Sequence, residues 1–331
     1  MRMSGRPCSR RAPQWPSLVA VFALAALTAG CVMREGAATS FEKTLTVDGP
    51  VRLEVRNGAG DTEITPGPPG QVHIRGEYRL QRFIWAGARR LEDLRDNPPI
   101  EQSGNTINIG LDADRLRYFT ITYKIAVPRE TLVRARAGSG DIRARGIRGP
   151  LRLNAGSGDI AAEDIGDEVE AGTGSGDIHL LRVEGPVSAG AGSGDLVLDA
   201  LRDDVRARTG SGDITVSRPA RRLHAITGSG DIRITDATAD INISTDSGDL
   251  TILGNPAANS YWDLRTSSGE VRLDLSPTAS FRFYARTNSG RIETRMPLVV
   301  EDKDRRTLRA RAGNGDARIE VVTSSGNIRI R

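Results

Sequence analysis

The sequence predicts an all-β fold, a β-solenoid built from stacked 18-residue coils with two short strands per coil. Two observations predict it. A turn tetrapeptide, Gly-Ser-Gly-Asp or a close variant, recurs at a constant interval, and the residues between its copies alternate between apolar and polar. Every interval is 18 residues, and the copies end at Asp141, Asp159, Asp177, Asp195, Asp213, Asp231 and Asp249. Equal spacing over seven copies indicates one structural unit repeated along the chain.

Each unit contains two alternating runs of residues. One and three positions after an aspartate stand apolar residues such as Ile178 and Leu180, and ten and twelve positions after it stand others such as Val187 and Ala189. The positions between them are mostly polar, and a period of two is typical of a strand with one buried face. We therefore expect two short strands per unit, with one turn at Gly-Ser-Gly and a second near Gly149-Pro150.

A two-stranded unit cannot bury its apolar face alone. Stacking the units creates a continuous core and pairs each strand with its copies above and below, which is a β-solenoid. The same alternation also fits a long antiparallel meander of hairpins. A single turn marker in every 18 residues favours the solenoid, and the many alanines and threonines at inward positions predict a thin core.

Both ends of the chain depart from the regular repeat. Residues 41–131 form a β-rich region with one helix candidate, Ala86–Asp96, and we expect this region to cap the open end of the solenoid. The solenoid then spans 132–331, regular over 132–252 and irregular over 253–331. Weaker copies of the marker continue at Glu270, Arg291, Asp316 and Asn327, and an earlier relative is Gly58-Ala59-Gly60-Asp61.

Residues 1–30 have the pattern of a bacterial lipoprotein signal peptide. An arginine-rich start precedes the apolar stretch Leu18–Leu27, which is too short to span a bilayer as a helix. The following string, Leu27-Thr28-Ala29-Gly30-Cys31, resembles a lipobox, in which cleavage precedes a cysteine that receives a diacylglycerol thioether and acyl chains such as palmitate. We therefore expect lipid attachment at Cys31 and a tether over residues 31–40. Thr28 stands where leucine is usual, so ordinary cleavage near Ala29 and a short uncleaved anchor stay open as alternatives.

Lipid on Cys31 predicts that the membrane is one partner and that the protein resides in the cell envelope. Several acyl chains on one residue would hold the protein firmly, because a single chain binds a membrane only marginally. Val32 follows the cysteine and lacks the aspartate that often retains lipoproteins at an inner membrane. If the cell has two membranes, the outer membrane is favoured, on its periplasmic or its surface face.

Charge and cysteine content exclude several function classes. Of 46 basic residues, four arginines lie in residues 1–30, which leaves 42 basic against 42 acidic residues in the rest of the chain. A neutral mature protein does not predict a nucleic-acid partner. Cys8 lies in the leader and Cys31 is the lipid site, so no cysteine remains for a disulfide, a metal site or redox chemistry.

Together, these features resemble a known family. The leader, the early strand pair around Gly58–Asp61, the single helix, the segment Ile125-Ala126-Val127-Pro128 and the Ser-Gly-Asp-Ile ladder look like the bacterial β-strand-repeat family labelled "putative adhesin", over nearly all of 41–331. The resemblance implies a β-solenoid-like fold and an envelope location. Its motifs are specific to the repeat architecture and not to any chemistry.

The column of seven aspartates is the sharpest candidate for a site. Stacked on one corner, neighbouring carboxylates would lie about 5 Å apart and repel each other by about 0.8 kcal/mol in water, which a bound cation such as calcium would relieve. We favour a structural interpretation, in which glycine supplies a positive φ for the turn while serine and aspartate side chains bond local backbone amides. Calcium-binding rolls carry an aspartate in every nine residues, whereas here it appears once in 18. We therefore predict no metal site.

No catalytic residues and no cofactor are predicted. The three histidines, His73, His179 and His224, are far apart and occupy different positions of the repeat. The sequence thus predicts a non-enzymatic, lipid-anchored envelope protein, which presents a rigid β-solenoid surface to an envelope or surface protein or to a glycan, as an adhesin or an envelope-stress partner. The alternative is a carbohydrate-active β-helix enzyme such as a polysaccharide lyase, which would gather two or three carboxylates with an arginine in one groove.

Overall fold

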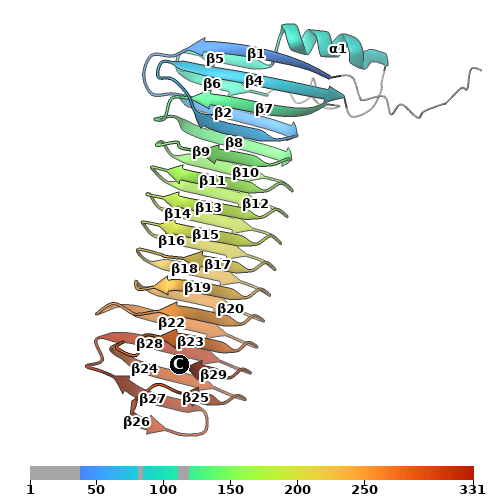
Figure 1. Cartoon of the computed structure of the whole chain (residues 1–331). Coiled ribbons are helices and arrows are strands. Elements are labelled where there is room, and N and C mark those ends of the chain that lie inside the picture. Colours follow the sequence, from blue (N-terminus) through green and yellow to red (C-terminus); the bar gives the residue numbers. More distant parts are fainter. Residues whose placement is uncertain (1–37, 81–84, 111–118) are drawn as a thin grey trace, which may run out of the picture. The chain divides into compact units, whose positions relative to one another are not determined.

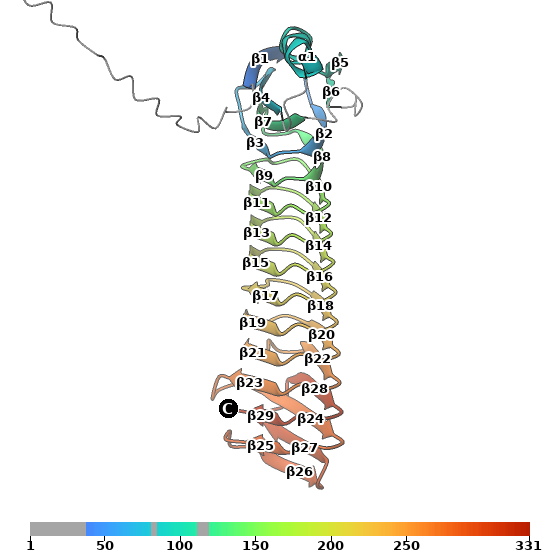
Figure 2. The same ribbon diagram turned by 90° about the vertical axis from the view of Figure 1, so that its right-hand side faces the viewer.

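The computed structural model describes residues 38–80, 85–110 and 119–331, and the unit that begins at Gly36 is a β-solenoid (Figure 1). Its strands form two long sheets that face each other across a thin core (Figure 2). Sheet A has 14 strands and sheet B has 15. The predicted signal peptide, Cys31 and residues 31–37 of the tether lie outside the described residues. The domain boundaries drawn from the sequence stay predictions.

Each regular coil contributes one strand to each sheet. Sheet A contains β9 (Ile142–Arg145), β11 (Ile160–Ile165), β13 (Ile178–Val183), β15 (Leu196–Leu201), β17 (Ile214–Ser217), β19 (Ile232–Ala237), β21 (Leu250–Gly254) and β23 (Val271–Leu275). Sheet B contains β8 (Leu132–Ser139), β10 (Leu151–Ala155), β12 (Val169–Thr173), β14 (Val187–Ala191), β16 (Val205–Thr209), β18 (Leu223–Thr227), β20 (Ile241–Thr245) and β22 (Tyr261–Thr266). Neighbouring coils pair parallel and in register, so that Ile178 lies between Ile160 and Leu196. The solenoid is therefore confirmed, and the antiparallel meander is wrong for the repeats.

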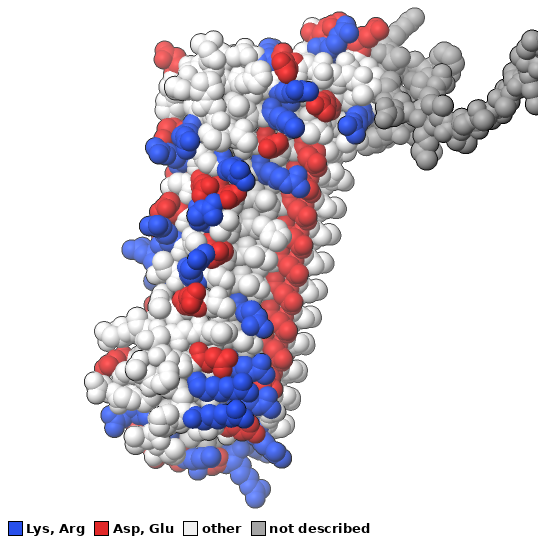
Figure 3. Space-filling model, in the orientation of Figure 1, with Lys and Arg blue, Asp and Glu red and all other residues white. Residues whose placement is uncertain are grey.

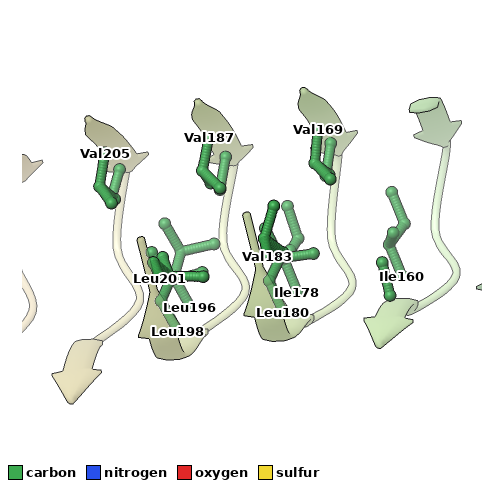
Figure 4. Close-up of a cluster of buried hydrophobic side chains, with 14 of the residues drawn as sticks. Ile160, Val169, Ile178, Leu180, Val183, Val187, Leu196, Leu198, Leu201 and Val205 are labelled. Atoms are coloured by element: carbon green, nitrogen blue, oxygen red, sulfur yellow. The ribbon is translucent and has the colours of Figure 1, made fainter. Parts of the chain in front are cut away.

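The inward residues of the two sheets form one continuous core. Figure 4 shows leucines, isoleucines and valines of both sheets meeting between the strands, among them Ile178, Leu180 and Val187. Burying each such side chain contributes roughly 1.5–3 kcal/mol. The aromatic residues Trp262, Phe281 and Phe283 of the C-terminal coils are also buried in this core.

The N-terminal end contains a complete coil and a cap. Strands β2 (Arg52–Ala59) and β3 (Thr62–Pro66) pair directly with β8 and β9, so the segment predicted as a cap contains one true coil. On sheet A, β7 (Phe119–Val127) pairs parallel with β3, and β4 (Gln71–Leu80) and β1 (Ala38–Thr46) follow it antiparallel. On sheet B, β6 (Thr106–Ile109) pairs parallel with β2, and β5 (Ile100–Ser103) follows it antiparallel. The predicted helix is α1 (Trp85–Asp96), which lies against β1.

At the C-terminal end the order in space differs from the order in sequence. The last coil, β28 (Ala317–Thr323) and β29 (Ile328–Ile330), lies between the coil of β22 and β23 and the coil of β24 (Phe281–Thr287) and β25 (Ile292–Thr294). The strands β26 (Val299–Lys303) and β27 (Thr307–Ala312) extend sheet B antiparallel. The sequence predicted irregular coils over 253–331 but not their order, because coils that share the same alternation can stack in more than one order.

Among the described residues, no helix is both long and apolar enough to cross a membrane.

Candidate functional site

The Gly-Ser-Gly-Asp segments form one corner of the solenoid, which we call the aspartate corner. Its glycines lie outside the left-handed region of φ, so the positive φ expected from the sequence is wrong. Their role is a close approach between coils. A Cβ added to the second glycine of any coil from Gly158 to Gly248 would lie 1.7–2.1 Å from the carbonyl oxygen of its counterpart in the coil before. Glycine is required there because any side chain would hold the coils apart.

The aspartates of this corner form a hydrogen-bonded ladder. Each Oδ1 accepts the backbone N–H of the aspartate in the following coil, as in Asp195 to Asp177 and Asp213 to Asp195, both at 2.8 Å. The ladder begins at Asp61 and ends at the N–H of Glu270, with distances of 2.7–3.1 Å. The side chains therefore bond the next coil and not a local amide, which corrects the expectation. Figure 3 shows the resulting acidic stripe.

This ladder gives the aspartate column a structural role. One oxygen of each carboxylate is engaged by a backbone N–H, which offsets part of the repulsion between neighbouring carboxylates. Within the described residues, no three His, Cys, Asp or Glu side chains come together in a way that could hold a metal ion. Melting in calcium and in chelator tests whether a cation also binds the column of Asp141, Asp159, Asp177, Asp195, Asp213, Asp231 and Asp249.

A second ladder inside the same corner consists of threonine hydroxyls and was not predicted from the sequence. Thr209 is buried, and its hydroxyl donates to the carbonyl of Gly194 at 2.9 Å while accepting the N–H of Gly212 at 3.3 Å. Other threonines in the same column, including Thr173, Thr227, Thr245 and Thr266, donate in the same way. The only signal was a recurring threonine before Gly-Ser-Gly, which the alternation alone assigns to the core.

The opposite corner turns through a left-handed residue in each regular coil, and we call it the left-handed corner. Gly146, Asp164, Arg182, Ala200, Arg218 and Asp236 occupy the same position and have φ of 53–66°. Five of these six residues carry a side chain, for which this conformation is strained. No single residue type marks the position, so the sequence did not predict it.

Ion pairs join neighbouring coils at the left-handed corner. Arg182 binds both Asp164 and Glu163, Arg218 binds Asp199 at 2.6 Å, and Arg221, Arg202 and Arg145 make further pairs with acids one coil away. The Arg182 guanidinium, hydrogen-bonded to Asp164, holds the pKa of that carboxyl below its usual range. Because these side chains are exposed, water and salt screen each pair and its contribution to stability is small. The charges on this side of the solenoid thus largely neutralise one another.

The combination expected for a lyase, two carboxylates with an arginine, occurs in one shallow hollow on sheet A. This hollow of about 310 Å³ contains Glu63 and Glu163 together with His179, Arg143 and Arg145. However, Glu163 forms ion pairs with Arg145 at 2.9 Å and with Arg182, and these arginines compensate its negative charge. The other histidines lie elsewhere: His73 contacts Thr44, and His224 contacts Asn242. Of the two acids in this hollow, Glu163 is therefore engaged in ion pairs between coils.

The family model of Toastrack DUF4097 matches residues 129–225 and 220–331, more than half of the chain. The chain belongs to the Toastrack DUF4097 family. The match covers the regular coils and the irregular C-terminal coils of this family member. This match confirms the resemblance predicted from the β-strand repeat.

Three similar solved structures illustrate this likeness. A "putative lipid binding protein" from Parabacteroides distasonis is 12% identical, with a TM-score of 0.42 over 88% of this chain and 97% of that one. A "putative adhesin" from Bacteroides fragilis is 13% identical, with a TM-score of 0.36 over 88% and 97%. A "putative cell adhesion protein" from Clostridium sporogenes is 14% identical, with a TM-score of 0.24 over 88% and 99%. These values are too low to transfer a residue role to the Toastrack chain. No curated protein matches it.

Proposed function

We propose that this Toastrack protein is a non-enzymatic, lipid-anchored protein of the cell envelope, which presents the rigid surface of its solenoid to a protein or a glycan. The observation that carries the proposal is that the charged side chains at both corners bind neighbouring coils of the same chain. Aspartates at one corner bond the backbone of the next coil, and acids at the other pair with arginines one coil away. Side chains engaged in this way stiffen the stack and are poor acids or bases.

The repeat itself supports a role in display. In-register parallel pairing holds every outward side chain at a constant spacing from its neighbours in the coils above and below. A surface of this kind suits an extended partner, which contacts several coils at once. Adhesion to an outside surface and binding of an envelope-stress sensor are two versions of the same proposal.

Anchoring is tested at Cys31. In the native host, Cys31→Ser is expected to abolish metabolic labelling with an alkyne analogue of palmitate and to release the protein from the membrane fraction. A matched control, Cys8→Ser in the leader, should leave labelling and fractionation unchanged. Labelled Cys31→Ser protein in the membrane fraction would contradict the lipid site. For the wild type, separation of the inner and outer membranes tests the outer-membrane location, and protease digestion of intact cells tests whether the protein lies on the surface or the periplasmic face.

The interaction role is tested by crosslinking in intact cells. We expect the wild-type lipoprotein to crosslink to a defined envelope or surface component, identified by mass spectrometry against a strain lacking the protein. Purified protein should release no products from polysaccharides of the same envelope. Failure to recover a partner, together with turnover of a glycan, would overturn the proposal in favour of a polysaccharide lyase.

A further inference from the structure

The surface beside the start of β22 departs from the regular coils. The interval from Asp249 to Glu270 is 21 residues against 18 in the coils before it, and the added length lies in the connection 255–260. In Figure 1 this connection reaches beyond the turns of the coils above it, and Figure 3 shows uncharged surface bulging outward there. A loop of unequal length breaks the flat side of a solenoid and creates a hollow next to itself.

A second loop completes this hollow because the last coil lies next to β22. The connection 313–316 leads into β28, which pairs with β22, and the N–H of Asn259 donates to the carbonyl of Asp316 at 3.0 Å. Two adjoining hollows result, of about 590 and 400 Å³, which share Asn259 and Ser260. We call them together the β22 hollow. Gly313–Asp316, predicted as a turn marker, thus lies at this hollow and not at the aspartate corner.

The second loop is held in a fixed conformation. The hydroxyl of Ser280 accepts the N–H groups of Asn314, Gly315 and Asp316 at 2.9, 3.0 and 3.4 Å, and donates to a carboxylate oxygen of Asp316 at 2.8 Å. Gly313 and Gly315 have φ of 55° and 77°, which the loop requires to turn around this hydroxyl. A fixed loop loses little conformational entropy when it binds a ligand.

The β22 hollow presents an exposed aromatic ring. Tyr261 is 38% exposed, and the described residues include no other aromatic side chain among the large exposed hydrophobics. Its hydroxyl donates to Glu320 at 2.9 Å, and the Arg318 guanidinium lies 5.4 Å from the ring centre. Next to it, Trp262 is buried and donates to the carbonyl of Ala239 at 2.8 Å, which fixes the strand. The ring is therefore oriented and partly exposed, with the Arg318 guanidinium over one of its faces.

Unengaged polar groups line the same hollow. The side chains of Asn259, Asn314 and Arg282 are exposed, and they make no hydrogen bond or ion pair with other residues that the structure describes. Amide and guanidinium groups are planar and offer paired donors or a donor beside an acceptor. This geometry matches neighbouring hydroxyls on a sugar ring, whereas an apolar peptide would leave these groups unpaired.

The charge around the hollow argues against a polyanion. Arg222 pairs with Asp204, and Arg318 pairs with Glu320, so much of the basic charge is already neutralised. Asp240 and Asp316 add acidic charge to the same lining. A nucleic acid or a highly sulfated chain would need a net basic groove, whereas an uncharged chain pays no such electrostatic penalty.

We infer that the β22 hollow binds a neutral oligosaccharide, with Tyr261 as the platform on which one sugar ring stacks. The C–H face of a sugar packs on the electron-rich face of an aromatic ring, while Asn259, Asn314 and Arg282 bond its hydroxyls. The inference rests on the proposed function, since it names the glycan class of partner for the same envelope protein.

The test uses the mature lipoprotein in detergent with cellotetraose, chitotetraose and maltotetraose as probes, followed by saturation-transfer NMR and calorimetry. We expect saturable binding of at least one probe. Tyr261→Ala should weaken it about tenfold or more, as loss of a central aromatic contact does. Tyr261→Phe, which keeps the ring, should stay within about twofold of wild type, and so should the matched control Val197→Ala on the outward face of sheet A.

Two results would overturn the inference: no binding of any probe by the wild type, or equal binding by the wild type and Tyr261→Ala. If Tyr261→Ala does not fold, the double variant Asn259→Ala/Asn314→Ala replaces it, because both side chains are exposed and unengaged. In-cell crosslinking of the wild type separates the two proposals. A wild-type protein that crosslinks to a protein partner but binds no probe rejects the oligosaccharide site and leaves the interaction role standing.

Discussion

At the aspartate corner every regular coil repeats nearly the same four residues, whereas at the left-handed corner successive coils place Gly146, Asp164, Arg182, Ala200, Arg218 and Asp236 at one position. The first corner stacks backbone directly on backbone, with side chains excluded at the glycines and hydrogen-bonded in fixed roles at the aspartates and threonines. The second corner repeats only a backbone conformation, and its side chains pair at the surface. Sequence is uniform where atoms of neighbouring coils touch and varied where only a torsion angle is shared.

The glycine contacts should dominate the stability of the aspartate corner. In Gly194→Ala, the new Cβ would lie 1.7 Å from the carbonyl oxygen of Gly176, so the coils must separate. We expect the free energy of unfolding to fall by about 3 kcal/mol, the upper range for overpacking, measured from urea melts.

The matched control is Gly190→Ala, four residues away on the outward face of β14. Its Cβ would have no neighbour closer than 3.9 Å, so we expect no loss and a gain of up to about 0.5 kcal/mol from the reduced entropy of the unfolded chain. Equal losses in both variants would show that the stacking contact is not the reason for glycine at this corner.

The threonine ladder should contribute less than the glycine contacts. Thr209→Val removes the donor to Gly194 and the acceptor for Gly212 while keeping the shape of the side chain. We expect a loss of about 1–2 kcal/mol, because buried backbone groups lose their partners. Thr215→Val, on the outward face of β17, should change the free energy of unfolding by less than about 0.5 kcal/mol. In the coil of β14 the threonine position is occupied by Ala191, so the hydroxyl is not essential to every coil. If Thr209→Val lost more free energy of unfolding than Gly194→Ala, the glycine contacts would not be the larger contribution.

Two substitutions in the aspartate ladder distinguish the contribution of its hydrogen bonds to stability from the effect of its charges. Asp195→Ala removes the acceptor of the Asp213 N–H and should cost about 1 kcal/mol. Asp195→Asn keeps an oxygen at the same place and removes two repulsive contacts with neighbouring carboxylates, so we expect no loss. Thermal melts of the wild type in calcium and in chelator should coincide. A higher midpoint in calcium, lost in Asp195→Asn, would instead establish a cation site in this column.

The contrast between the corners also explains which features of the structure could be predicted from the sequence and which could not. Asp141 to Asp249 and the apolar residues after them predict the coil and its two strands, because each copy meets the same contacts. The left-handed position could not be predicted, since glycine, aspartate, arginine and alanine share no side-chain property. Neither could the position of β28 beside β22, because identical alternation permits several stacking orders. The β22 hollow depends on that order, so Tyr261 and Asn314 could not be placed together from the sequence.

The smallest expected effect tests the left-handed corner itself. Ala200 has a φ of 54°, which costs an alanine roughly 1 kcal/mol relative to glycine. Ala200→Gly relieves this strain but makes the unfolded chain more flexible, so we expect a net gain of about 0.5 kcal/mol in the free energy of unfolding. Ala161→Gly, on the outward face of β11 in ordinary strand conformation, should lose about 0.5–1 kcal/mol under the same conditions. Opposite signs for the two alanines would show that this corner selects a torsion angle, whereas equal losses would mean that the side chain at position 200 makes contacts that matter more than its φ.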